Sequence, residues 1–146
     1  MSSQNNIKII ADYCNRMVQG DFAALHELVS PAWITHAMPT VILKAFNNIT
    51  SAVEGERIFF KQLTRAFSQR KLILHKNMAI DEDHVVINYT IYGIHDNANF
   101  FDVPPSGEQE KIDGTAIFRL ENGKIIEHWG GPTCCTCTGY VKISCE

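Results

Sequence analysis

The sequence has no excess of positive charge and no long apolar run, and each absence excludes a class of function. Lys and Arg together number 13 against 16 Asp and Glu, which gives a formal net charge of −3 at pH 7. Nucleic-acid-binding domains usually carry a basic surface, so we expect no nucleic-acid partner. No apolar stretch approaches the roughly 18 residues that a membrane-spanning helix needs, so we expect no membrane partner.

Cysteine is scarce outside the C-terminal end. The chain has five cysteines, and four of them fall among the last thirteen residues: Cys134, Cys135, Cys137 and Cys145. The polar first six residues lack the layout of a secretion signal, so we expect a cytoplasmic protein without a disulfide framework. Zinc sites usually hold two pairs of ligands, and no second pair accompanies this cluster. We therefore predict no metal site and no other cofactor.

What is present fits one globular domain over residues 1–146. The hydrophobic residues make up 45% of the chain and the charged residues 20%, which is ordinary for such a domain. A chain of this length can bury about 68–70% of its unfolded surface, enough for one core. No repeat or linker-like segment divides it.

Apolar spacing predicts helices first and strands afterwards. The expected helices cover residues 5–19, 22–29 and 51–67, and residues 32–39 are expected to be extended or turning. The expected strands cover residues 71–80, 84–95, 109–120, 124–130 and 140–145. Asn122-Gly123 predicts a hairpin turn between two of them. This order indicates the α+β class, with helices packed on one face of an antiparallel sheet.

Three motifs in the second half of the chain carry a family resemblance. Residues 104–107 read Pro-Pro-Ser-Gly, residues 114–119 read Gly-Thr-Ala-Ile-Phe-Arg, and residues 123–129 read Gly-Lys-Ile-Ile-Glu-His-Trp. Together they resemble the SnoaL-like polyketide cyclases, a family within the NTF2-like fold. The resemblance implies a cone, in which a curved antiparallel sheet wraps around the N-terminal helices and encloses a cavity.

The resemblance also implies a function and an assembly. We expect a homodimer and a cofactor-independent isomerase or cyclase, with a hydrolase or lyase reaction left open. The enzyme would act by acid/base catalysis on a small hydrophobic polyketide- or terpenoid-derived intermediate of secondary metabolite biosynthesis. The alternative is a non-catalytic small-molecule-binding or dimerisation module, because the fold alone does not decide between them.

Two positions depart from the resemblance. The acidic catalytic position of the family corresponds to Ala116, which has no carboxylate. Limonene epoxide hydrolase, a related family, has an aspartate two residues beyond the tryptophan, where this chain has Gly131. The first departure favours the non-catalytic alternative.

The two-residue turn at 122–123 predicts which side chains face the cavity. With that turn, Phe118 lies opposite Glu127, and Ala116 opposite Trp129, and cross-strand partners share a face. This face is the more apolar one, so we expect it to lie under the helices and to line the cavity.

The opposite face of the hairpin carries Arg119 and His128. Its side chains are mixed and charged. We expect it to form the dimer interface or to lie in solvent.

The predicted catalytic residues are His36 and Glu127. His36 resembles, by position, the general base of ketosteroid isomerases, and an imidazole titrates near neutral pH. Its alternative role is to bond loop backbone and hold a turn. Glu127, among aromatic side chains, would have a raised pKa and could serve as an acid or base. Its alternative is to pair with a nearby Arg or to lie at the sheet edge.

The predicted substrate-binding residues are Tyr13, Asn88, Tyr92, Phe118 and Trp129. In the family, Tyr13 lies near the cavity mouth and could donate to a substrate oxygen, and ordinary core packing is its alternative. Asn88 and Tyr92 share one face of their strand. The sequence leaves open whether this face or the more apolar opposite face lines the cavity.

Overall fold

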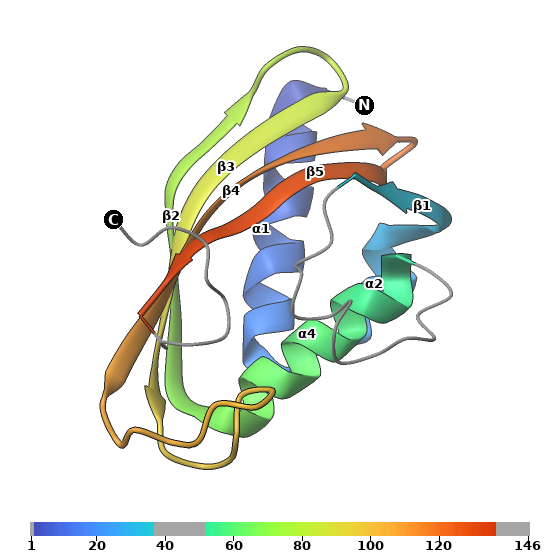
Figure 1. Cartoon of the computed structure of the whole chain (residues 1–146). Helices are drawn as coiled ribbons and strands as arrows, with labels where there is room; N and C mark the ends of the chain where they lie inside the picture. The colour runs from blue at the N-terminus through green and yellow to red at the C-terminus, as the bar shows by residue number, and fades with distance from the viewer. Residues whose placement is uncertain (1, 37–51, 137–146) are drawn as a thin grey trace.

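The helices lie inside the curve of one sheet (Figure 1). The computed structural model describes residues 2–36 and 52–136. Within these ranges the elements are α1 (Ser3–Gln19), α2 (Ala24–Leu28), β1 (Val29–Thr35), α4 (Ala52–Ala66), β2 (Phe67–Ala79), β3 (His84–His95), β4 (Gln109–Glu121) and β5 (Lys124–Cys135). The predicted α+β class is confirmed. The strand predicted over 140–145 lies outside the described residues.

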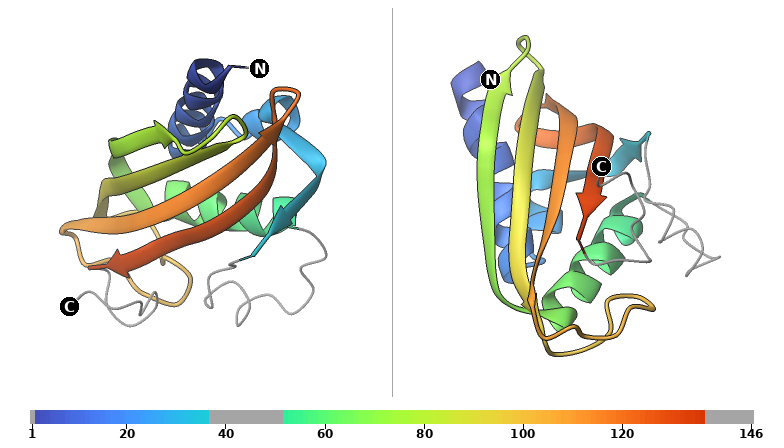
Figure 2. Two further views of the ribbon diagram at one scale, coloured as in Figure 1. Left: turned by 90° about the horizontal axis from the view of Figure 1, so that it is seen from above. Right: turned by 60° about the vertical axis from the view of Figure 1, so that its left-hand side comes forward.

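The sheet has the strand order β1-β5-β4-β3-β2. It is curved and unclosed, and α4 crosses its concave side (Figure 2). The pairs β2–β3, β3–β4 and β4–β5 are antiparallel, whereas β1 pairs with β5 in parallel. The edge strand therefore departs from the expected antiparallel sheet. The chain reaches β1 directly from α2. The sequence predicts extended or turning structure only for residues 32–39, so the first part of this strand, which begins at Val29, is not predicted.

Helix α1 forms because its ends are capped and one face is apolar. The Ser2 hydroxyl accepts a hydrogen bond of 3.2 Å from the Asn5 N–H, which satisfies one free donor of the first turn. Gly20 ends the helix with φ at 90°, a left-handed conformation that glycine adopts without strain. Ile10 and Met17 are 0% exposed, so this face anchors α1 to the sheet.

The β4–β5 hairpin begins with the expected turn. Residues 122 and 123 both have positive φ, at 52° and 78°, as a type I′ turn requires. Leu120 lies opposite Ile125, which also agrees with the prediction. Beyond this pair the register shifts by one residue, so that Arg119 lies opposite Glu127.

This β-bulge exchanges the two faces of β5. Phe118 lies opposite His128, and Ile117 lies opposite Trp129. Because side chains alternate along a strand, one extra residue moves every later side chain to the other face. The prediction that Glu127 and Trp129 share a face with Phe118 is therefore wrong. His128 lies under the helices instead of on the outer face, by which we mean the face of the sheet away from the helices.

Strand β3 turns its apolar face toward the helices. Val85, Ile87 and Ile91 are buried, with at most 5% of their surface exposed. Since neighbouring side chains point to opposite faces, Asn88 and Tyr92 lie on the outer face. The sequence leaves open which face of this strand lines the cavity, and in the structure it is the apolar face.

Candidate functional site

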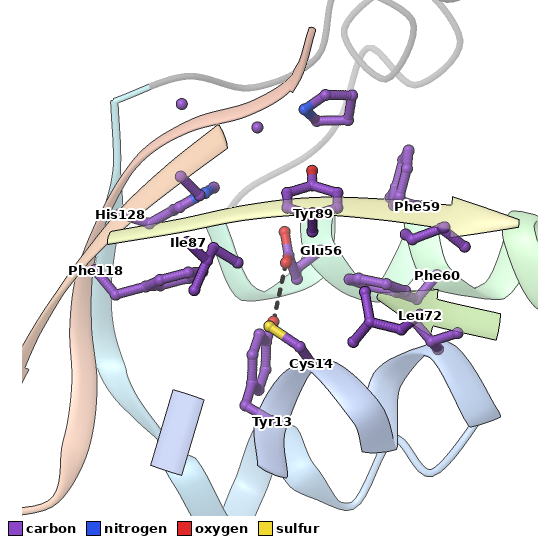
Figure 3. A pocket seen from close by; sticks show the side chains of 16 residues that line it. Tyr13, Cys14, Glu56, Phe59, Phe60, Leu72, Ile87, Tyr89, Phe118 and His128 are labelled. Carbon is purple, nitrogen blue, oxygen red and sulfur yellow. Dashed lines mark hydrogen bonds between the residues drawn. The ribbon is translucent and has the colours of Figure 1, made fainter. Parts of the chain in front are cut away.

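A pocket opens between α1, α4 and the concave face of the sheet (Figure 3). The cavity has a volume of ≈ 60 Å³, several times the roughly 10–15 Å³ that one water needs. Its walls are mainly apolar and aromatic, and they include Phe59, Phe60, Leu72, Ile87 and Phe118. The site therefore suits a small hydrophobic ligand or the hydrophobic end of a larger one.

A carboxyl group lies inside this apolar pocket. Glu56 lies on α4 at helical spacing from Phe59, Phe60 and Leu63, so it belongs to the stripe that faces the sheet. The Tyr13 hydroxyl on α1 donates a hydrogen bond of 2.9 Å to Glu56 Oε1. Figure 3 shows the carboxylate between Tyr13 and Tyr89, in the middle of the pocket.

Burial determines how Glu56 titrates. Desolvation raises the pKa of the Glu56 carboxyl from 4.5 to about 7, while the hydrogen bond from Tyr13 opposes this rise. At neutral pH the group is therefore divided between its protonated and ionised forms. A carboxyl in this condition can both accept and donate a proton, which is what an acid/base catalyst must do.

Two further polar side chains line the pocket from the sheet. His128 is 7% exposed and stacks on Phe118 with ring centroids 4.9 Å apart. Burial, and then the charge of His36, lower the pKa of His128 to about 4, so its imidazole is neutral at pH 7. Burial, followed by the charge of Glu56, raises the pKa of Tyr89, so it too stays protonated.

Gly114 makes room for Tyr89. A Cβ atom at position 114 would lie 2.3 Å from the Tyr89 hydroxyl oxygen. The tyrosine ring can therefore lie across β4 only because this residue has no side chain.

Cys14 also lines the pocket, on α1. Burial, followed by the charge of Glu56, raises the pKa of its thiol to about 12. The thiolate is the nucleophilic form of cysteine, so Cys14 acts here as a small apolar side chain.

Of the residues predicted from the sequence, Tyr13 and Phe118 line this pocket. The predicted catalytic pair lies elsewhere but is joined: His36 Nε2 and Glu127 Oε2 are 2.5 Å apart. Arg119 donates to the other oxygen of Glu127 at 2.7 Å. The bonds from His36 and then Arg119 lower the pKa of Glu127, the opposite of the rise expected for a buried acid. This matches the alternative in which Glu127 pairs with an Arg.

The remaining predicted binding residues lie on the outer face. Trp129 stacks on His36 with ring centroids 5.0 Å apart. Asn88 donates a hydrogen bond to the Gly114 carbonyl oxygen at 3.1 Å. Tyr92 lines a separate shallow hollow beside Lys71. None of the three lines the pocket that contains the Glu56 carboxylate.

Sequence reasoning missed Glu56, Tyr89 and His128. A usable pattern existed for Glu56, because it precedes Phe59, Phe60 and Leu63 at the spacing of one helix face. A single carboxylate on such a stripe is a candidate for a buried acid. His128 could be found only by placing the bulge in β5, which the turn residues do not predict.

Neither a metal site nor a membrane-spanning helix is found among the described residues. Within residues 2–36 and 52–136, no three His, Cys, Asp or Glu side chains gather where they could hold a metal ion. Cys135 is buried, and Cys137 and Cys145 lie outside the described residues. That the cysteine cluster binds no metal stays a prediction, and stoichiometric zinc in protein purified without added metal would contradict it. No helix in the described part of the chain has the length and apolar character needed to cross a membrane.

Comparison with known proteins agrees with the sequence motifs. A sequence model for one protein family, described as SnoaL-like polyketide cyclase, matches residues 9–132. No curated protein matches the chain significantly.

Solved structures share the fold. AclR from Streptomyces galilaeus, named as a candidate hydroxylase, has a TM-score of 0.72 and 20% identity, with 90% of this chain and 76% of that chain covered. IdmH from Streptomyces antibioticus, named as a candidate polyketide cyclase, has a TM-score of 0.70 and 21% identity, with 87% and 91% covered. An NTF2-like protein from Burkholderia thailandensis has a TM-score of 0.59 and 19% identity, with 90% and 92% covered. The predicted NTF2-like fold is thus confirmed.

Proposed function

Because the chain belongs to the SnoaL-like polyketide cyclase family, we propose that it is a cofactor-independent isomerase or cyclase of secondary metabolite biosynthesis. Its substrate is a small hydrophobic polyketide- or terpenoid-derived molecule with an enolisable carbonyl group. One observation carries this proposal: the Glu56 carboxyl, with its pKa raised to about 7, lies inside an apolar pocket and is held by Tyr13.

The reaction is a proton transfer next to the carbonyl. The ionised Glu56 carboxylate takes a proton from the carbon beside the carbonyl, and the C–H electron pair moves to the carbonyl oxygen to give an enolate. In an isomerisation, Glu56 returns the proton to another carbon of the conjugated system. In a cyclisation, the enolate carbon bonds to a second carbonyl carbon, and Glu56 gives the proton to the new alkoxide. Neither the isomerisation nor the cyclisation needs an oxidant or a reductant.

Glu56 accounts for the departure at Ala116. Ala116 and Glu56 line the same pocket, one from β4 and the other from the facing helix α4. The missing carboxylate on the strand therefore does not leave the pocket without a base. Catalysis in this chain would use a carboxylate from a different wall, while the apolar walls exclude water and fix the ligand.

The pair His36 and Glu127, predicted from the sequence, is the second candidate for acid/base work. In its favour, an imidazole and a carboxylate lie in contact, with His36 Nε2 and Glu127 Oε2 2.5 Å apart. Their separation from the pocket walls counts against it, because an acid or base must reach the reacting atom. We therefore assign the role to Glu56 first.

A non-catalytic binding module is the alternative function. Among the described residues that line the pocket, none is Lys or Arg, and the walls hold several aromatic rings beside the Glu56 carboxylate. Aromatic faces and a carboxylate attract cations. A binding module with this pocket would hold a hydrophobic amine, whereas the enzyme would act on a neutral ketone.

Deuterium incorporation into a small aryl ketone tests the proposal. Acetophenone in D₂O exchanges its methyl protons only after enolisation, so the protein should accelerate exchange if Glu56 acts as a base. Glu56→Gln should slow the catalysed exchange about 10²–10⁴-fold, the usual share of one acid/base group. Glu54→Gln is the matched control, because Glu54 lies on the same helix but pairs with Arg57 at 2.7 Å. Tight binding of a benzylic amine without any catalysed exchange would favour the binding module.

We further propose a cytoplasmic homodimer of one domain per chain, formed through the outer face of the sheet. The outer face carries Trp129, Ile117 and Arg119 beside apolar groups such as Met78, which is 52% exposed. His128, expected on this surface, does not belong to it.

A further inference from the structure

His128 reaches the pocket from β5, on the wall that it shares with Phe118 (Figure 3). Its ring is held on three sides. Phe118 stacks on one face, Trp33 lies against it with centroids 5.7 Å apart, and the Thr35 hydroxyl lies 3.2 Å from Nδ1. These contacts fix the orientation of the imidazole before any ligand enters.

Thr35 is positioned for this contact by the edge of the sheet. β1 runs parallel to β5, and Thr35 lies in register with His128. The next residue, His36, donates its backbone N–H to the His128 carbonyl oxygen at 2.9 Å. The distance between the Thr35 hydroxyl and the imidazole is therefore set by backbone pairing rather than by a mobile loop.

The partner of one ring nitrogen decides which nitrogen carries the proton of a neutral imidazole. If the Thr35 hydroxyl donates to Nδ1, the ring proton lies on Nε2. Because Nδ1 contacts Thr35 and His128 lines the pocket, Nε2 is the ring nitrogen left for a ligand there. A proton on Nε2 is favoured in a pocket that also contains the Glu56 carboxylate, since a lone pair facing a negative charge is electrostatically unfavourable in an apolar site.

We propose that His128 is a catalytic residue whose Nε2–H donates a hydrogen bond to the carbonyl oxygen of the ligand, and that Thr35 is the positioning residue that fixes this tautomer. The assignment rests on the proposed function, since it gives the enolate formed by Glu56 its hydrogen-bond donor. A preorganised donor at an oxygen that gains charge stabilises the transition state more than the ground state. The ligand class is thereby narrowed to neutral molecules that present an acidic C–H to α4 and a carbonyl oxygen to β5.

The tautomer can be measured without any substrate. A two-bond ¹H–¹⁵N correlation spectrum at pH 7, with the His128 signals identified by their loss in His128→Gln, should show Nε2 protonated and Nδ1 bare. Thr35→Val, which keeps the shape but removes the hydroxyl, should shift the ring toward the other tautomer, and Thr35→Ser should restore it. A proton on Nδ1 in the wild type, or no change in Thr35→Val, would overturn the proposal.

Binding of p-cresol tests the donor itself. This small phenol resembles an enol, with an O–H for Glu56 and a lone pair for His128. His128→Phe should weaken cresol binding at least about tenfold, and His128→Gln, which keeps an N–H near the position of Nε2, should recover part of it. Equal affinity in wild type and His128→Phe, or no measurable binding to the wild type, would contradict the proposal. Unchanged ketone exchange in Glu56→Gln would instead overturn the proposed function, so the two failures are distinguishable.

Discussion

The Tyr13 hydroxyl on α1 donates a hydrogen bond of 2.9 Å to the Glu56 carboxylate on α4. This bond links two helices inside an apolar pocket. A hydrogen bond to a carboxylate stabilises its ionised form, so Tyr13 offsets part of the burial that raises the pKa of Glu56. Tyr13 thus influences the pH at which Glu56 becomes a base.

Tyr13→Phe should move the pH–rate profile of ketone exchange to higher pH. The rate depends on ionised Glu56, and loss of the hydrogen bond raises the pKa of Glu56 above about 7. The rate at pH 7 should fall several-fold, less than in Glu56→Gln, and it should recover at higher pH. Tyr89→Phe is the control, because Tyr89 lines the same pocket but makes no hydrogen bond to Glu56 among the described contacts. The midpoint of the pH–rate profile should therefore be the same in Tyr89→Phe as in the wild type. An unchanged midpoint in Tyr13→Phe would show that this hydrogen bond does not set the pKa of the catalytic group.

Glu56 should also make stability depend on pH. Its pKa is about 7 in the folded protein against 4.5 for the ordinary group, so between these values the unfolded chain holds fewer protons at this site. The free energy of unfolding should therefore fall as pH rises from 4.5 to 7, and this contribution should be constant above that range. Urea unfolding of wild type and Glu56→Gln at several pH values measures it. Parallel curves for the two proteins would show that burial does not perturb Glu56.

Glu127→Gln separates the two candidate acid/base sites. Glu127 pairs with His36 and Arg119 away from the pocket, so we expect ketone exchange near the wild-type rate. If the pair predicted from the sequence were catalytic, the rate would fall about 10²–10⁴-fold instead. His36→Ala should agree with Glu127→Gln in either case, because the two side chains would act together.

The oligomeric state tests the proposed use of the outer face. We expect a dimer by light scattering at micromolar concentration. Met78→Glu should favour the monomer, because it places a charge on the apolar part of this face, where Met78 is 52% exposed. A wild-type monomer would contradict the prediction.

Sequence patterns gave the architecture because they depend on local rules. The spacing of Ile10 and Met17 predicted α1, and alternation predicted β3 with the bounds that the structure has. Family motifs indicated the cone. Edge strand β1 was not predicted, because its pairing with β5 is set by contacts between segments far apart in the chain.

The site was predicted less well, for a physical reason. A two-residue turn fixes strand register only as far as the next bulge. The turn alone predicts Glu127 opposite Phe118 on the pocket wall, but one extra residue in β5 places His128 there instead. Glu56 was overlooked because a carboxylate in the first turns of a helix resembles an ordinary solvent-exposed residue. Its spacing from Phe59, Phe60 and Leu63 indicates the inward face of the helix, and the packing of α4 against the sheet confirms it.

The pH dependence of acetophenone deuteration is the most direct test of Glu56 as the base. We expect a catalysed rate that rises with pH through a midpoint near the Glu56 pKa of about 7. Glu56→Gln should lose both this rise and about 10²–10⁴-fold of the rate, while Glu54→Gln retains them. A Glu56→Gln variant that is folded and exchanges the ketone at the wild-type rate, with the same pH profile, would show that Glu56 is not the base.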